Sequence, residues 1–195
     1  MNIETNRLVI RKLQQDDLEA SFAHRSDPDV CRYVSKPITR QQAQSRIDMF
    51  SKPWKKQENE KNVLAIELKS AGQLVGEVMI KYSNVESQIA EIGYRLASRY
   101  QGQGYAFEAA SALLDYGFSQ LNLHKITALC VAENTASWRL MEKLGMKKEG
   151  ELASHFKIGD AWKDGLIYAK INPAHQMAAS QPREVKSAEF LKEVV

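Results

Sequence analysis

The sequence predicts a single α/β domain (α+β mixed), with a central, mostly antiparallel mixed sheet, one parallel crossover and helices on both faces. Three apolar strands, at 62–69, 73–82 and 87–97, are joined by connections short enough only for hairpins. These strands should therefore be antiparallel. A helix then separates the third of them from another apolar strand at 124–132. A strand–helix–strand order of this kind implies one parallel crossover.

Size and composition fit one soluble domain with a substantial core. The chain has 195 residues, of which 26% are charged and 44% hydrophobic, and this balance is typical of globular proteins. We expect the domain to span residues 1–172. Residues 173–195, which are polar and rich in Ala, Ser and Gln, form a C-terminal appendage. Its end, SAEFLKEVV, is expected to add one or two helical turns.

The charge pattern argues against several classes of protein. A formal net charge of +3 allows an anionic ligand but not the clustered Lys and Arg of a nucleic-acid footprint. No run approaches the roughly 18 apolar residues of a membrane span, and the opening MNIETNRLVI is not a signal peptide. With only Cys31 and Cys130, neither a disulfide framework nor a metal site is indicated. A cytoplasmic protein that binds neither nucleic acid nor membrane is therefore expected.

One strand and two helices are expected before the three hairpin strands. NRLVIRKLQ (6–14) alternates enough to predict a first strand. DDLEASFAHRS (16–26) predicts a helix with acidic residues at its positive N-terminal end, ended by Asp27-Pro28. A further helix should begin after Thr39 as its N-cap and continue until Pro53.

Two helices and a hairpin make up the rest of the domain. In the helix at 105–121, one stripe of residues is expected to face solvent: Glu108, Ser111, Asp115 and Ser119. A shorter helix at 134–145 has Asn134 in its N-cap region and Gly145 as its C′ stop. The last two strands are expected at about 146–158 and 162–171. Cys130, inside an apolar strand, is interpreted as a core residue rather than a nucleophile.

The loop RYQGQGYAFEAA (99–110) places two glycines at the start of the longer helix. Glycine lets a backbone approach a ligand closely, and successive N–H groups at a helix N-terminus can hold a pyrophosphate without lysine. Phe107 stands where a dinucleotide-binding motif needs its third glycine. Tyr105 and Ala106 stand where a P-loop needs Lys and Ser/Thr. The loop by itself leaves two alternatives, another kind of phosphate site or a simple glycine-rich turn.

Longer stretches around this loop carry a resemblance to a known family. QGQGYA (101–106) matches the Q/R-x-x-G-x-G/A motif of the GNAT acetyltransferase superfamily, and IAEIGYRL before it is similar to the fourth strand of that fold. EIGYRL together with N-x-x-S-x-x-L-M-E-K-L-G-M from Asn134 resembles the subgroup of RimJ/RimL-type ribosomal-protein N-terminal acetyltransferases. HFKIGDAWKDGLIYAKI resembles the closing hairpin of that subgroup. The likeness covers about residues 3–171.

The resemblance implies a GNAT-like domain and an N-acetyltransferase that transfers acetyl directly from acetyl-CoA, its cosubstrate, to a primary amine, without a metal. The loop is implied to hold the CoA pyrophosphate through Gln101, Gly102, Gln103, Gly104, Tyr105 and Ala106. The backbone of Leu96 and Ala97 would pair with the pantetheine amides. Asn134 would contact the pantetheine as well as capping its helix.

The resemblance also implies catalytic residues. Many GNAT enzymes carry a tyrosine where this chain has Met141, and this departure favours Ser137 as the group that protonates the leaving thiolate. Glu91 is a carboxylate in an otherwise apolar strand and is the first candidate for the base that deprotonates the amine. The alternative for Glu91 is a solvated or salt-bridged strand residue. Glu133 and Glu151 are weaker candidates for the base.

The acceptor stays open at this point. A protein N-terminus, a polyamine, an aminoglycoside or another small amine all fit, and residues 15–60 would shape the pocket. His155 and Phe156 are candidates for its edge. The alternative function is a non-catalytic CoA-binding or ribosome-associated module with the same fold, and a homodimer is left open.

Overall fold

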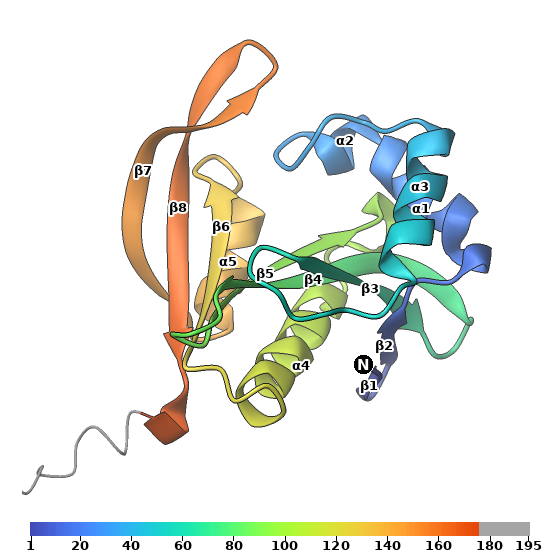
Figure 1. Ribbon diagram of the computed structural model, residues 1–195. Coiled ribbons are helices and arrows are strands. Elements are labelled where there is room, and N and C mark those ends of the chain that lie inside the picture. The colour runs from blue at the N-terminus through green and yellow to red at the C-terminus, as the bar shows by residue number, and fades with distance from the viewer. Residues whose placement is uncertain (176–195) are drawn as a thin grey trace, which may run out of the picture.

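The computed structural model describes residues 1–175, and one mixed sheet runs through this part of the chain (Figure 1). Its strands lie in the order β1-β2-β3-β4-β5-β6-β8-β7. They are β1 (Ile3–Glu4), β2 (Leu8–Lys12), β3 (Lys61–Leu68), β4 (Gln73–Asn84), β5 (Ile89–Leu96), β6 (Lys125–Val131), β7 (Lys147–Ile158) and β8 (Ala161–Ile171). The α-helices are α1 (Leu18–Ser26), α2 (Pro28–Cys31), α3 (Arg40–Phe50), α4 (Tyr105–Ser119) and α5 (Thr135–Lys143).

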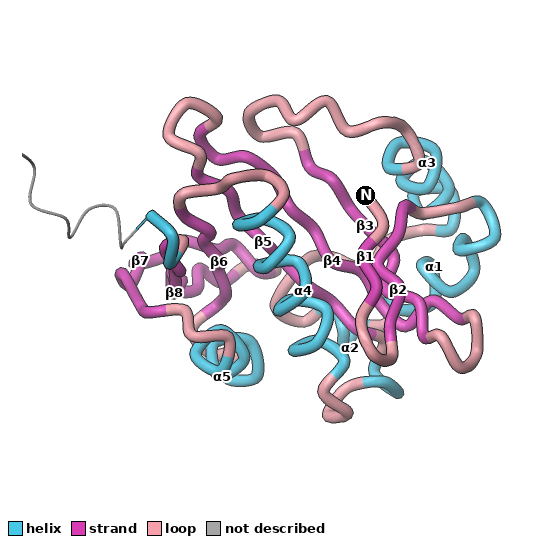
Figure 2. The backbone as a smooth tube through the Cα atoms, turned by 90° about the horizontal axis from the view of Figure 1, so that it is seen from below, coloured by secondary structure: helices cyan, strands magenta, loops and turns pink. Residues whose placement is uncertain are grey.

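Helices cover both faces of the sheet, as the sequence predicts. Helices α1–α3 lie over one face and α4 and α5 over the other (Figures 1 and 2). The strands supply each face with alternate residues. In β3, Leu64 and Ile66 belong to the core under α4 and α5, whereas Val63 and Ala65 belong to the core under α1 and α3. The two apolar faces of one strand thus hold two helical layers together.

The strand pairing confirms the predicted directions. Strands β3, β4 and β5 pair antiparallel, and β5 pairs parallel with β6 across the α4 crossover. The parallel ladder is short, running from Ile89 opposite Lys125 to Ile92 opposite Ala128. Beyond that point β5 continues to Leu96 and β6 to Val131 without pairing to each other. The two strands therefore part near the middle of the sheet.

Two boundaries in the first third differ from the prediction. The predicted strand at 6–14 is shorter in the structure, where β2 covers only Leu8–Lys12. The two-residue strand β1 precedes it across a turn in which Thr5 Oγ1 accepts from the N–H of Leu8 at 2.9 Å. Thr39 is the N-cap of α3, as predicted, and forms a capping box with Gln42. Helix α3 ends at Phe50 rather than running to Pro53, because an Xaa-Pro sequence disfavours helix before the proline.

The second half follows the prediction closely. Helix α5 is capped by Asn134, and Gly145 has the left-handed conformation (φ +75°) of a helix stop. Strands β7 and β8 form the closing hairpin, and Cys130 is buried in the core. The predicted domain boundary after residue 172 stays a prediction. The helical turns expected in SAEFLKEVV lie outside the described residues.

Candidate active site

The glycine loop presents free backbone donors at the start of α4. Gly102 and Gly104 both have positive φ (+73° and +82°), and residues 101–104 are exposed. A Cβ at Gly102 would meet no atom within 4 Å. The N–H groups of residues 102–107 donate to no other described residue. Because they lie at the positive end of a 15-residue helix, they form a cradle for an anion.

An ion pair between Arg7, just before β2, and Glu108 of α4 holds this cradle in place. Glu108, in the first turn of α4, accepts from Thr5 Oγ1 at 2.6 Å and from the N–H and Nε of Arg7 at 2.8 and 2.7 Å. Burial raises the pKa of Glu108, but these bonds outweigh burial and lower it. Arg7 also donates to the carbonyl of Gln103 at 3.0 Å. Glu108 is therefore not the solvated residue that the helical stripe predicts.

The end of β5 that does not pair with β6 lies next to this loop. Among the residues predicted there, Leu96 has its carbonyl bonded to the side chain of Gln101 at 3.2 Å. The N–H of Ala97 donates to Val75 at 3.0 Å, and its carbonyl accepts from Tyr100 at 2.9 Å. The predicted pairing of Ala97 with a ligand would therefore have to replace internal bonds. The stretch from Gly93 to Leu96, where the pairing with β6 has ended, offers the better backbone edge.

Ser137 and Tyr94 meet where β5 and β6 part. The side chain of Asn134 accepts from the N–H of Ser137 at 3.3 Å and so begins helix α5. Tyr94 Oη donates to the carbonyl of Ser137 at 2.9 Å and lies 3.1 Å from its Oγ. Burial raises the pKa of Tyr94, so the phenol stays protonated. No local sequence pattern marks Tyr94, because its partner lies 43 residues further along the chain.

The other residues considered from the sequence are either buried or paired with a lysine. Met141 is almost fully buried, which fits its inability to act as a proton donor. Burial raises the pKa of Cys130, so its thiol stays protonated. Glu133 forms an ion pair with Lys163 at 2.7 Å, which lowers the pKa of the glutamate, and Glu151 pairs with Lys148. In residues 1–175 no group of metal-ligating side chains forms, and no helix there could span a membrane.

Charged residues flank the same point on the opposite face of β5, the face under α1–α3. Three successive cross-strand pairs lie there: Lys81 with Glu91, Met79 with Gly93, and Glu77 with Arg95. Lys81 and Glu91 form an ion pair at 3.1 Å and are both partly exposed. This bears out the salt-bridged alternative for Glu91 without removing its carboxylate from solvent. We call these six residues the acceptor face.

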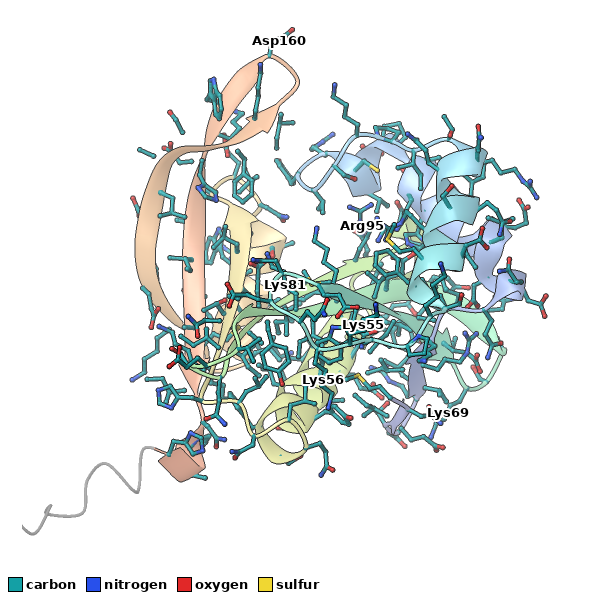
Figure 3. The ribbon with its side chains drawn as sticks, viewed as in Figure 1. Lys55, Lys56, Lys69, Lys81, Arg95 and Asp160 are labelled. Atoms are coloured by element: carbon teal, nitrogen blue, oxygen red, sulfur yellow. The ribbon has the colours of Figure 1, made fainter. Side chains whose placement is uncertain are left out.

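Glu77, at the far end of the acceptor face, is buried in a cationic network. It accepts from Ser21 at 2.7 Å and from Arg25 Nε at 2.9 Å, and Arg46 reaches it at 3.4 Å. Burial alone would raise the pKa of Glu77, but the neighbouring His24 and Arg25 hold it well below its usual value. Arg95 lies between the sheet and the helices of this side, whereas Lys81 lies nearer β6 (Figure 3).

The arrangement defines a class of enzyme site. A phosphate cradle, a free strand edge and a hydroxyl lie on one side of the parting strands, and a partly exposed carboxylate lies on the other. These are the parts needed to hold a phosphate-bearing acyl carrier against an acceptor and to move protons during acyl transfer. A surface hollow of about 520 Å³ beside Gly104 and Phe107 adjoins the cradle.

Comparison with known proteins identifies the family. Residues 7–147 match the family model described as the acetyltransferase (GNAT) domain. The uncharacterized N-acetyltransferase YnaD of Bacillus subtilis (strain 168) is 34% identical over 170 residues, covering 87% of this chain and 96% of YnaD. The crystal structure of a GNAT-family acetyltransferase from Bacillus anthracis is 34% identical with a TM-score of 0.80, covering 88% of this chain and 99% of that one.

The chain therefore belongs to the GNAT acetyltransferase family. It is an acyltransferase of the N-acetyltransferase class, and its acetyl donor is acetyl-CoA. The fold is shared with the spermidine N-acetyltransferase from Vibrio cholerae, solved in complex with CoA and spermine. That likeness has a TM-score of 0.75 and covers 86% of this chain and 97% of the other, but at 24% identity it shows the fold alone.

Proposed function

We propose that this enzyme transfers acetyl directly from acetyl-CoA to a primary amine at the point where β5 and β6 part, with Ser137 as the acid and Glu91 as the base. Acetyl-CoA supplies the activated acyl group as a thioester. One observation carries the proposal: the pairing of β5 with β6 ends at Ile92, with Ser137 and Tyr94 near one face of β5 and Glu91 on the other.

The loop is proposed to bind the pyrophosphate of CoA. The free N–H groups of residues 102–107 can each donate to a phosphate oxygen, and the two glycines keep side chains out of the way. The side chains of Gln101, Gln103 and Tyr105 and the small Ala106 line the cradle. The strand edge up to Leu96 and the side-chain amide of Asn134 are proposed to contact the pantetheine arm.

Glu91 is proposed to take the proton of the amine, directly or through a water. An α-amino group has a pKa of about 7.7–8.0 and a lysine about 10.4, so the acceptor arrives largely protonated and must lose a proton before it attacks. The carboxylate of Glu91 is reachable from solvent and is held by Lys81 at 3.1 Å.

Ser137 is proposed to donate a hydrogen bond or a proton to the departing thiolate. Asn134 fixes the start of its helix, and Tyr94 contacts both the carbonyl and the hydroxyl of Ser137. Tyr94 is therefore a positioning residue, because it restricts the rotamer of the serine hydroxyl. Neutral backbone donors on the free edge of β5 would stabilise the oxyanion that forms on the acyl carbon.

The proposal also covers the subgroup of the enzyme, its cellular location and its oligomeric state. The Asn134–Ser137 spacing supports a RimJ/RimL-type enzyme, whose acceptor is a peptide N-terminus or a small amine. We place the enzyme in the cytoplasm, acting on a dissolved acceptor rather than on nucleic acid or a membrane, as a monomer or a homodimer. Residues 1–172 would suffice for the activity.

The test is acetyl-CoA turnover against a panel of amines that includes N-terminal peptides, polyamines and amino acids. We expect Ser137→Ala to lower kcat by about 10- to 100-fold with little change in the KM for acetyl-CoA, because an acid contributes mainly to the transition state. Ser119→Ala, at the exposed end of α4, is the matched control. Saturable acetyl-CoA binding without turnover on any amine would instead establish a non-catalytic module, and full activity of Ser137→Ala would refute the assignment of the acid.

A further inference from the structure

We propose that the acceptor amine carries a carboxylate, which Arg95 binds at the end of the acceptor face opposite Glu91. The inference rests on the proposed function and narrows it to one substrate class, small zwitterionic amines such as ω-amino acids and short acidic peptides. Its basis is an imbalance of charge between the two ends of the acceptor face.

The middle of the acceptor face is uncharged and lies between two charged ends. Its middle pair, Met79 and Gly93, carries no charge, and a Cβ built at Gly93 would touch only the tip of Met79, at 3.3 Å. Glu91 and Arg95 project from the same face of β5, four residues apart, so their Cα atoms are separated by about 13 Å at a rise of about 3.3 Å per residue. An extended acceptor lying over Gly93 would therefore reach towards both.

The two ends of this face differ in how their charges are paired. At one end Lys81 and Glu91 neutralise each other at 3.1 Å. At the other end the register places Glu77 opposite Arg95, yet Glu77 is bonded to Arg25 and Arg46 instead. The guanidinium groups of Arg25, Arg46 and Arg95 thus lie near one carboxylate, which leaves a surplus of two positive charges (3 − 1) among these four groups.

Arg95 is the member of the network without an acidic partner in the described part of the chain. It is only 8% exposed. Its bonds go to the hydroxyl of Ser35 at 3.1 Å and, weakly, to the sulfur of Cys31 at 4.0 Å. Burial and the repulsion of Arg25 lower the pKa of Arg95 to about 10, so it remains charged at neutral pH. A buried cation that is bonded to no carboxylate is costly to a fold.

A carboxylate is the ligand that matches this site. The planar guanidinium binds a carboxylate through two parallel hydrogen bonds, a geometry that a neutral hydroxyl does not offer. Ser35 is exposed, so a carboxylate that displaces the serine contact would approach the guanidinium from the side of Ser35. A polyamine would instead bring further positive charge towards the surplus, and like charges repel there.

The span between Glu91 and Arg95 also favours acceptors with separated charges. In an α-amino acid the nitrogen and the carboxylate sit on one carbon, too close to contact both ends of the acceptor face together. An ω-amino acid, or a short peptide with an acidic side chain or C-terminus, places several bonds between them. Its amine would lie near Glu91 while its carboxylate contacts Arg95.

The experiment compares matched acceptors that differ in one group. Acetyl-CoA-dependent initial rates are measured for 6-aminohexanoate, 6-aminohexanamide and 1,6-diaminohexane, and for Ala-Asp against Ala-Asn, both with the C-terminus amidated so that the side chain carries the only carboxylate. We expect kcat/KM to be about 10- to 100-fold higher for each acid than for its amide, the size of a charge-assisted hydrogen bond, with the diamine lowest. Equal rates for acid and amide, turnover confined to acceptors without a carboxylate, or a preference for the diamine would overturn the inference and leave the N-acetyltransferase standing. If no amine of any class is acetylated, the proposed function fails as well.

Two variants of Arg95 separate binding from folding. Arg95→Met keeps the length and removes the charge, so the acid-to-amide ratio should fall to about one while the KM for acetyl-CoA stays unchanged. Arg95→Lys should keep part of the ratio. Because Arg95→Met removes an uncompensated charge, its melting temperature should stay equal or rise, whereas Arg25→Met, which takes a partner from Glu77, should melt lower. A ratio that survives in Arg95→Met, or a melting temperature that falls as far as in Arg25→Met without any change of ratio, would show that Arg95 is structural only.

Discussion

The two faces of β5 are built from different kinds of groups. On the face of α4 and α5, the proposed donor site is made from one stretch of chain, from the end of β5 through the glycine loop to Ser137, and most of its groups are backbone. On the other face, the acceptor face carries its charges on side chains of β4 and β5, and its Glu77 is bonded to residues of α1 and α3 that lie 31 to 56 positions earlier in the chain.

This difference suggests which part of the enzyme depends on the backbone and which part depends on individual side chains. Backbone N–H groups at a helix start recognise phosphate whatever the side chains are, so one loop can serve every enzyme that uses the same acyl donor. Side-chain charges can be exchanged singly, so the acceptor face can change its ligand without changing the fold. The predictions below test this contrast, beginning with the largest expected effect.

Glu77→Gln should destabilise the protein more than any substitution on the donor side. It leaves Arg25 and Arg46 without their shared carboxylate, and removing one partner of a buried ion pair costs about 3–5 kcal/mol in the free energy of unfolding. Chemical denaturation measures this loss. Glu91→Gln, at the partly exposed pair, is the control and should cost less than about 1 kcal/mol. Equal losses in the two variants would refute the contrast between the ends of the acceptor face.

The same carboxylate predicts a pH dependence. The pKa of folded Glu77 is well below that of an unfolded glutamate, about 4.3. Its contribution to stability is therefore complete above that unfolded value and is lost as the pH falls through the folded pKa. The melting temperature of the wild type should drop on acidification below about pH 4, and Glu77→Gln should show a shallower drop. Parallel curves for the two proteins would contradict this.

Glu91→Gln should have the second largest effect, on catalysis rather than on folding. If Glu91 is the base, kcat/KM for the amine should fall by about 100-fold at neutral pH, and the loss should shrink as the pH approaches the pKa of the amine. Glu151→Gln, at an exposed pair on β7, is the control and should leave the rate unchanged. A loss that does not depend on pH would assign Glu91 a role in positioning instead.

The contrast also explains how much could be predicted from the sequence. The hairpins, the parallel crossover and the caps at Thr39 and Asn134 were all predictable, because each depends on residues close together in the chain. The loop at 101–106 was predictable for the same reason. The parting of β5 and β6 is located by residue only in the structure, since the end of a ladder depends on both strands at once.

The features missed by the prediction all depend on contacts between distant segments. Glu108 fits the polar stripe of its helix, yet Arg7, 101 residues earlier, removes it from solvent. Tyr94 looks like an ordinary strand residue until α5 brings Ser137 to it. The surplus charge at Arg95 cannot be seen in the composition, because the arginines that occupy Glu77 come from two different helices.

Gly104→Ala should have a moderate effect that is confined to the donor side. Gly104 has φ +82°, and an added Cβ would lie 3.3 Å from Arg7 Nη2. The left-handed conformation costs a residue with a Cβ about 1–2 kcal/mol, so the loop should shift and the KM for acetyl-CoA should rise several-fold. Gly159→Ala, in the hairpin turn with φ +60° and no atom near its Cβ, carries similar strain. It should lower stability without changing that KM, and a matching change in both variants would argue against the loop as the pyrophosphate site.

Tyr94→Phe should have the smallest effect and the most specific one. It removes a hydroxyl that contacts Ser137 but leaves the ring in the core, so we expect a loss of about 1 kcal/mol in stability. If Tyr94 positions the acid, kcat should fall by less than about tenfold while both KM values hold. In the Ser137→Ala background the same substitution should then cost nothing further in kcat, because a positioning residue has no effect once its target is gone. Tyr82→Phe, at a buried tyrosine of β4 stacked on Trp54, controls for the loss of a hydroxyl elsewhere in the same core. An additive loss in the double variant would mean that Tyr94 supports the active site independently of Ser137, and the donor side would then contain two separate contributors rather than one coupled pair.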